Sequence, residues 1–99
     1  MPTPVVRVNR AVAVGRAGSP DQGLALLATL EVDAASRARL EAYQPYHAAR
    51  ADLLREAGRP SEAVAAYDRA IELAEGDAER RFLQTQRNTA AACGRGPAV

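Results

Sequence analysis

The feature that most constrains the fold of this chain is an internal repeat without gaps, at a spacing of 40 residues. Residues 11–30, AVAVGRAGSPDQGLALLATL, align with residues 51–70, ADLLREAGRPSEAVAAYDRA. In both copies a Gly-x-Pro sequence separates two segments that are rich in alanine and leucine. Each copy therefore predicts a helix, a tight turn and a second helix. Because one such pair cannot bury its apolar face alone, the unit has a physical reason to recur.

The turn residues predict where these helices end and begin. Gly18 and Gly58 are expected to adopt the left-handed conformation that closes a helix. The proline two residues after each glycine suits the first position of the next helix, where a missing N–H costs nothing. Ser19 and Gln22 have the spacing of a capping box, in which each side chain satisfies the other's free backbone donor.

The second helix of the second copy has an apolar stripe at helical spacing. Its members are Ala63, Tyr67, Ala70, Ile71 and Ala74. This i, i+4, i+7, i+8, i+11 pattern is typical of a buried helix face. The small alanines allow the partner helix to approach closely, and Tyr67 is expected to fill the gap between the two units.

The pattern as a whole predicts an all-α, solenoid-like domain at residues 4–88. Asp77 is expected to cap a final helix that shields the end of the solenoid. The connector is charged, with one helical turn around residues 37–41. The expected parts are a first helix pair at 4–30, the connector at 31–43, a second pair at 45–75, a capping helix at 77–88 and a flexible tail at 89–99.

Composition excludes several classes of function. The formal net charge is +1, all 13 basic residues are arginine, and acids are interspersed among them, so a basic stripe for nucleic acid is absent. Cys93 is the only cysteine, which rules out an intrachain disulfide or a cysteine-cluster metal site. No apolar run reaches the ~18 residues of a membrane span and no signal peptide opens the chain, so a cytoplasmic protein is expected.

Catalytic and metal sites have no support in the sequence. No Ser/His/Asp or Cys/His set and no phosphate-binding glycine loop is present, so we expect neither an enzyme nor a cofactor. His47 has no second histidine or cysteine nearby. We expect it to pack at the start of its helix with one ring nitrogen bonded to the backbone.

The first helix of each pair is expected to line the concave groove of the solenoid and to supply its partner contacts. Asn9 either contacts a partner or bonds to the neighbouring helix. Asp52, Arg55, Glu56 and Arg59 have i+3 and i+4 spacings, which favour a solvated, self-paired face as the alternative. The candidate partner-binding residues are Asn9, Arg10, Val12, Arg16, Ala48, Asp52, Arg55 and Glu56.

The spacing of Gly58, Ala63, Tyr67 and Ala70 resembles the tetratricopeptide repeat signature. The first copy keeps only the glycine of this signature. A longer likeness covers about residues 3–87, through TPVVRVNRAVAVGRAGSPDQGLALL, YQPYHAARADLLREAGRPSEAVAAYDRAIELA and DAERRFLQTQR. These segments look like the C-terminal, tetratricopeptide-like extension of extracytoplasmic-function-type bacterial sigma factors (sigma-70 family), which are common in actinobacteria.

The resemblance implies a regulatory role in promoter-directed transcription, with the sigma core regions and RNA polymerase as partners. The family's polymerase-binding and promoter-reading regions have no counterpart here, so the chain is expected to be a detached C-terminal piece that does not bind DNA directly. Without a preceding helix, a face of Val5, Val8 and Val12 is expected to be partly bare and to promote self-association. The alternative is a free-standing scaffold that binds an extended peptide in its concave groove.

Overall fold

The computed structural model describes residues 4–30 and 34–94, and the regular structure within these ranges is helical throughout. The prediction of an all-α protein is confirmed. None of the helices in these two ranges is both long and apolar enough to cross a lipid bilayer. The helices are α1 (Pro4–Ala17), α2 (Pro20–Ala28), α3 (Ala34–Glu41), α4 (Gln44–Glu56), α5 (Pro60–Leu73) and α6 (Asp77–Gly94).

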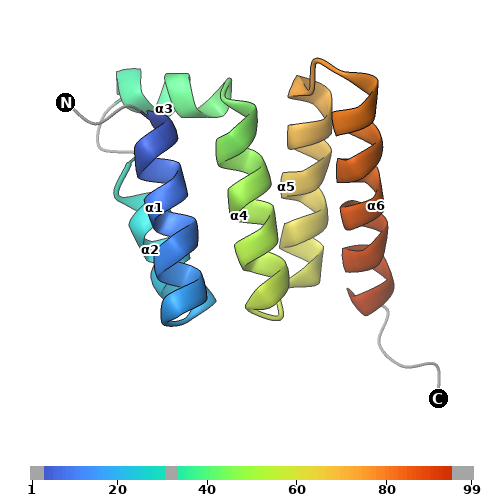
Figure 1. The fold of residues 1–99 in the computed structure, drawn as a ribbon, viewed down its shortest axis with the longest axis horizontal. Helices are drawn as coiled ribbons and strands as arrows, with labels where there is room; N and C mark the ends of the chain where they lie inside the picture. Colours follow the sequence, from blue (N-terminus) through green and yellow to red (C-terminus); the bar gives the residue numbers. More distant parts are fainter. Residues whose placement is uncertain (1–3, 31–33, 95–99) are drawn as a thin grey trace.

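Neighbouring helices pack as hairpins and together form a slab of 50 × 32 × 22 Å. Helices α1, α4, α5 and α6 lie side by side, with α2 behind α1 and α3 across one end (Figure 1). The pairs α1–α2 and α4–α5 are the two copies of the sequence repeat, and both α1 and α2 pack against α4. The joint between the two copies is therefore made by α4.

Two buried apolar clusters flank α4, which contributes to both. The predicted stripe on α5 is buried, with Ile71 half-buried at its edge. The first cluster joins α4, α5 and α6 and contains Ala51, Leu54, Ala63, Ala66, Tyr67, Ala70, Ala74, Leu83 and Ala90. The second joins α1, α2, α3 and α4 and contains Val8, Ala11, Leu27, Leu40, Tyr46, Ala49 and Leu53.

The two Gly-x-Pro turns have different geometries. Gly58 has a φ of +76° and is left-handed, as predicted. The same prediction was wrong for Gly18, which does not have a positive φ. A Cβ at Gly18 would instead collide with the Gln22 side chain, which accepts the Ser19 N–H at 3.1 Å. The predicted capping box is present, and a side chain at position 18 would require Gln22 to move out of it.

A glycine pair brings α1 and α2 unusually close together. A Cβ built on Gly23 would lie 2.8 Å from the Ala11 carbonyl oxygen and 3.0 Å from the Gly15 Cα. A Cβ on Gly15 would collide with the Leu53 side chain, which is buried. Both glycines therefore serve close helix packing, and neither needs an unusual backbone conformation.

Two helix boundaries differ from the sequence prediction. The helical part of the connector is longer than one turn, because α3 begins at Ala34 and its Leu40 is buried in the second cluster. Helix α6 continues past Asn88 to Gly94, so a flexible tail was wrong for residues 89–94, which include Cys93. The extension is explained by Ala90, which is fully buried in the first cluster. Residues 95–99 lie outside the described ranges.

The start of α6 also differs in detail. Asp77 is the first helical residue and not the cap. Its carboxylate accepts from Arg80 Nη1 at 3.0 Å, and Arg80 Nη2 donates to the Ala74 carbonyl oxygen at 3.1 Å. This arginine ties the beginning of α6 to the end of α5.

The predicted valine face of α1 is covered at Val8. Val8 is only 2% exposed and packs in the second cluster, and Val12 is half-buried against it. The side chain of Val5 lies outside the described part of the chain. The prediction of a bare face is therefore wrong for Val8, because α2, α3 and α4 cover it. Self-association of the chain stays a prediction.

Candidate functional site

Tyr67 of α5 anchors a polar network on one side of α4. The ring is fully buried, and its hydroxyl donates to Asp52 Oδ1. Arg55 Nε donates to the same hydroxyl oxygen at 3.2 Å, and its guanidinium lies 3.8 Å from the Asp52 carboxylate. The spacing of Asp52 and Arg55 predicted their pairing, but the shared tyrosine was missed. Two of the eight candidate partner-binding residues thus hold the second hairpin together.

The environment of Tyr67 keeps its hydroxyl protonated. Burial, followed by the hydrogen bond to the Asp52 carboxylate, raises the pKa of Tyr67 to about 12. A phenol with this pKa is not ionised near neutral pH. The network therefore supports a structural role for Tyr67 rather than acid–base chemistry. Within residues 4–30 and 34–94, no cluster of three or more His, Cys, Asp or Glu side chains could hold a metal ion.

The remaining candidate partner-binding residues lie on α1 and on the same side of α4. Asn9, Arg10, Arg16 and Glu56 are exposed, and Val12 and Ala48 are half-buried. Ala48 packs against the first apolar cluster. Because α1 contacts α4, the structure brings the two predicted groups onto adjacent helices. We call the side of these helices that carries Asn9, Val12, Arg16, Ala48, Asp52 and Glu56 the α1–α4 face; Arg10 lies roughly 200° from Val12 around α1 and is not part of it.

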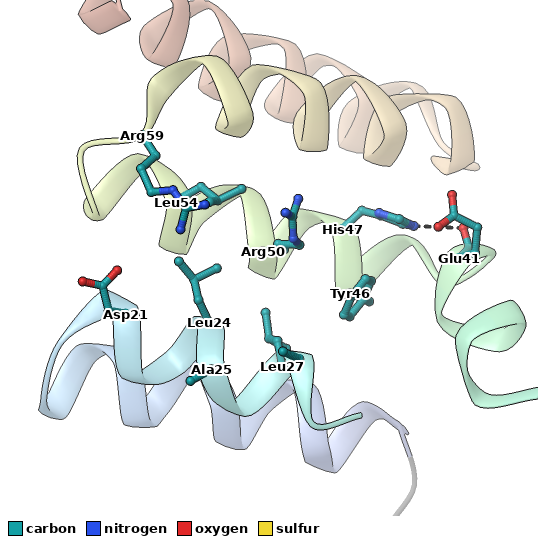
Figure 2. Close-up of a pocket in the computed structure, with 11 residues that line it drawn as sticks. Asp21, Leu24, Ala25, Leu27, Glu41, Tyr46, His47, Arg50, Leu54 and Arg59 are labelled. Atoms are coloured by element: carbon teal, nitrogen blue, oxygen red, sulfur yellow. Dashed lines mark hydrogen bonds between the residues drawn. The ribbon is translucent and has the colours of Figure 1, made fainter. Parts of the chain in front are cut away.

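The sequence did not predict a groove between α2 and α4. The cavity has a volume of about 510 Å³, and Figure 2 shows how its side chains line the space between the two helices. Helices α2, α3 and α4 supply all of the lining except Arg59, which directly precedes α5. We call this the α2–α4 groove, and its lining residues are Asp21, Leu24, Ala25, Leu27, Ala28, Glu41, Tyr46, His47, Arg50, Leu54 and Arg59.

The groove lies on the opposite side of α4 from the α1–α4 face. Residues two apart on an α-helix are separated by roughly 200° around its axis. Arg50, which lines the groove, therefore points away from Asp52, which was predicted to bind a partner. The groove floor draws on both apolar clusters, because Leu54 belongs to the first and Leu27 to the second. The groove thus follows the seam between the two hairpins.

At the α3 end of the groove, side chains of α4 and α5 hydrogen-bond to the backbone of α3. His47 is 7% exposed, and its Nε2 donates to the Glu41 carbonyl oxygen at 2.9 Å, as Figure 2 shows. The prediction that this histidine bonds to the backbone is confirmed. Arg69 of α5 also reaches this point, with Nη2 3.2 Å from the same oxygen and Nε 3.2 Å from the Glu41 carboxylate. The charge of Glu41 is thus already paired.

At the other end of the groove, Arg59 is held by the carboxylate of Glu62, in the first turn of α5. It donates to Glu62 through Nε at 2.9 Å and Nη2 at 2.6 Å, and this bond lowers the pKa of Glu62. The charges of Arg59 and Arg50 lower that pKa further, to a smaller extent. Within the described ranges, Arg50 and Asp21 have no ion pair. Arg50, half-buried in the middle of the groove, thus makes no ion pair within these ranges, and Glu62 is an acidic group that its charge reaches.

Comparison with known proteins gives one informative match. The chain is 41% identical over 85 residues to an uncharacterized protein of Rhizobium meliloti (strain 1021). This alignment covers 86% of the present chain but only 19% of the Rhizobium protein, so the chain spans about a fifth of the length of that relative. No family model matches the chain, and no solved structure matches it.

Proposed function

We propose that this chain is a tetratricopeptide-like docking domain that regulates a sigma factor of the extracytoplasmic-function type. In this role it binds the sigma core regions and RNA polymerase through protein–protein contacts and makes no contact with DNA. The work of the domain is to hold another polypeptide, so it is proposed to have no catalytic activity. The cytoplasm is the compartment that this role requires.

The observation that carries the proposal is the paired hairpin built on α4. Two copies of one helix–turn–helix unit pack through small side chains, as a tetratricopeptide-like solenoid requires, and α6 adds a further antiparallel helix. This architecture agrees with the sequence likeness to the sigma-factor extension over residues 3–87. The match to a fifth of a longer Rhizobium protein further supports a module that works as part of a larger polypeptide.

The chemistry of the surface also favours docking over catalysis. Among the described residues, buried side-chain nitrogen and oxygen atoms all have a hydrogen-bond partner, so the interior holds no polar group that awaits a substrate. Exposed polar groups on the α1–α4 face and along the α2–α4 groove are available to a protein partner.

The test is co-purification with RNA polymerase. The full-length Rhizobium relative, tagged and expressed in its own host, is expected to retain the core polymerase subunits. The present chain, added in excess, is expected to compete with the matching segment and reduce the recovered polymerase. Recovery of the relative without polymerase, under conditions that retain a known sigma factor, would count against the proposal.

A pair of variants tests the predicted surface within the same assay. The double variant Arg16→Glu with Glu56→Arg reverses two exposed charges on the α1–α4 face and is expected to weaken competition. The matched control is Arg37→Glu with Glu75→Arg, which reverses two exposed charges elsewhere. Equal competition by both variants would mean that the α1–α4 face is not the docking surface. Retention of short extended peptides without any polymerase would instead support the alternative, a free-standing scaffold.

A further inference from the structure

We infer that the α2–α4 groove receives a segment of the partner polypeptide that places an Asp or Glu side chain against Arg50 and a leucine-like side chain against Leu24 and Ala28 of α2. This inference rests on the proposed docking function and adds to it a second surface, away from the α1–α4 face, together with the chemistry of its occupant. It is carried by the shape of the groove and by the charge at its centre, which makes no ion pair within the described residues.

The base of the groove is preformed, and a small part of its accessible lining is apolar. Leu27, Leu54 and Tyr46 are buried in the cores, so their positions are fixed before any partner arrives. Leu24 is half-buried and covers the wall on α2. A volume of about 510 Å³ is typical of sites that hold a small ligand or a few side chains. Because Leu27 and Leu54 are buried beneath the surface, Leu24 and Ala28 supply the apolar area that a leucine-like side chain can contact.

Two of the four charged side chains around the groove are already paired within the chain. Glu41 is bound by Arg69, and Arg59 makes a two-point contact with Glu62. Asp21 lies in the first turn of α2, where the helix dipole already favours a negative charge. These three groups therefore gain little from a partner, and they leave Arg50 as the residue that selects one.

Arg50 is placed to select a carboxylate. Figure 2 shows its side chain on α4 between the Arg59 end and the His47 end of the groove, and in this view its guanidinium points away from the leucines of α2. A guanidinium presents parallel N–H donors that match the two oxygens of a carboxylate. Because Arg50 is half-buried beside apolar side chains, its attraction to a carboxylate is less screened than it would be in open water. An acidic residue flanked by leucines complements both features.

The test is a titration of the isotope-labelled chain with synthetic peptides, followed by amide chemical shifts. The probe is acetyl-Gly-Leu-Leu-Glu-Leu-Gly-amide, and its matched partners carry Gln or Lys in place of Glu. Shifts are expected in residues 21–28 and 46–54. The Glu peptide is expected to bind roughly fivefold more tightly than the Gln peptide, and more tightly still than the Lys peptide.

Three variants decide whether Arg50 is responsible. Arg50→Glu is expected to reverse the preference, so that the Lys peptide binds best. Arg50→Gln, which keeps most of the stem without the charge, is expected to abolish it and serves if the reversed charge disturbs folding. Arg37→Glu removes an exposed arginine of α3 outside the groove and is expected to leave the preference intact. Circular dichroism confirms that each variant is folded.

The outcomes separate this inference from the proposed function. Equal affinity for the three peptides, an unchanged preference in Arg50→Glu, or shifts confined to the α1–α4 face would overturn the groove proposal. If polymerase competition is also unaffected by Arg50→Glu, the docking function stands without the groove. If the peptides are selected through Arg50 but no polymerase is recovered, the groove stands and the sigma-factor role fails.

Discussion

The two hairpins have the same arrangement of helices but differ in the side chains that pack between those helices. In the second hairpin the contact is a polar network around a buried ring, and in the first the same positions are apolar and small. The three equivalent positions, each 40 residues apart, hold Tyr67, Asp52 and Arg55 in the second hairpin and Leu27, Val12 and Gly15 in the first.

This comparison shows that the three positions change as a set. Leu27 has no hydroxyl, and accordingly the first hairpin has no acceptor or donor at the positions of Asp52 and Arg55. The Leu27 side chain is smaller than that of Tyr67, and Gly15 and Gly23 compensate for this because they let the two helices lie closer together. In the second hairpin a large side chain, Tyr67, fills the space between the helices. In the first hairpin the helices lie close together and leave less space to fill. The two solutions should respond differently to substitution.

The largest expected effect is at Tyr67. Tyr67→Ala removes a fully buried ring and leaves Asp52 and Arg55 without their shared partner, so it should destabilise the fold by about 3–5 kcal/mol. Urea unfolding followed by circular dichroism measures this. Phe82→Ala is the control, because that ring is 62% exposed and its loss should change stability by less than ~0.5 kcal/mol. Similar losses for both variants would show that the second hairpin does not depend on Tyr67.

The next effect tests the close approach in the first hairpin. Gly23→Ala places a methyl group against the Ala11 carbonyl oxygen, which cannot move without shifting α1. The clash should outweigh the ~1 kcal/mol that alanine gains over glycine in a helix, giving a net loss of about 1–3 kcal/mol. The equivalent residue of the second hairpin, Ala63, already carries this methyl group. A more stable Gly23→Ala variant would mean that the first hairpin is not closed by glycine.

A smaller change isolates the hydroxyl of the network. Tyr67→Phe keeps the ring and should lose about 1–2 kcal/mol, because Asp52 and Arg55 are partly exposed and regain water. The wild type should also lose stability as pH rises from about 10 to about 12. Burial raises the folded pKa of Tyr67, so its proton is lost more easily in the unfolded chain, and stability is full only below the unfolded value.

The pH dependence has a clear control. Tyr67→Phe should show a weaker loss of stability over the same alkaline range, because it removes the hydroxyl whose pKa is raised on folding. The chain has no lysine, which leaves few other groups that titrate there. An identical pH profile in the variant, measured by urea unfolding at each pH, would contradict the assignment of the alkaline transition to Tyr67.

The smallest effects compare the two turns. Ser19→Ala removes the capping-box oxygen of α2 and should lose about 1 kcal/mol. Arg59 at the start of α5 offers no cap to the backbone and pairs with Glu62 at the surface. Arg59→Ala should therefore have the smaller effect, and one that fades at high salt. If Arg59→Ala is the more harmful of the two, its place at the groove matters more than the capping of α2.

Local signals predicted much of this fold. The repeat at 40 residues placed both hairpins, the Ser19–Gln22 spacing gave the capping box, and the stripe on α5 identified the core. These features depend on residues close together in the chain or on strict helical periodicity. One error was also local: Gly18 does not adopt a positive φ, and its close neighbour is the Gln22 side chain of the capping box.

The parts that sequence reasoning missed depend on contacts between helices. Arg69 reaches Glu41 across 28 residues, and Tyr67 reaches Asp52 across 15. The groove exists because α2 and α4 leave a space between their side chains, and no single helix encodes it. One signal in the sequence was available. Tyr67, Asp52 and Arg55 are all replaced in the first copy, and such a joint replacement indicates that the three positions are in contact.

The position of α4 has a mechanical consequence. Because its side chains complete both apolar clusters, neither hairpin can melt without exposing the other, and the slab should unfold in a single cooperative step. A polypeptide seated in the seam would brace both halves at once. Occupancy there would then be reported by the thermal resistance of the whole domain, including α6, which lies on the far side from the bound segment.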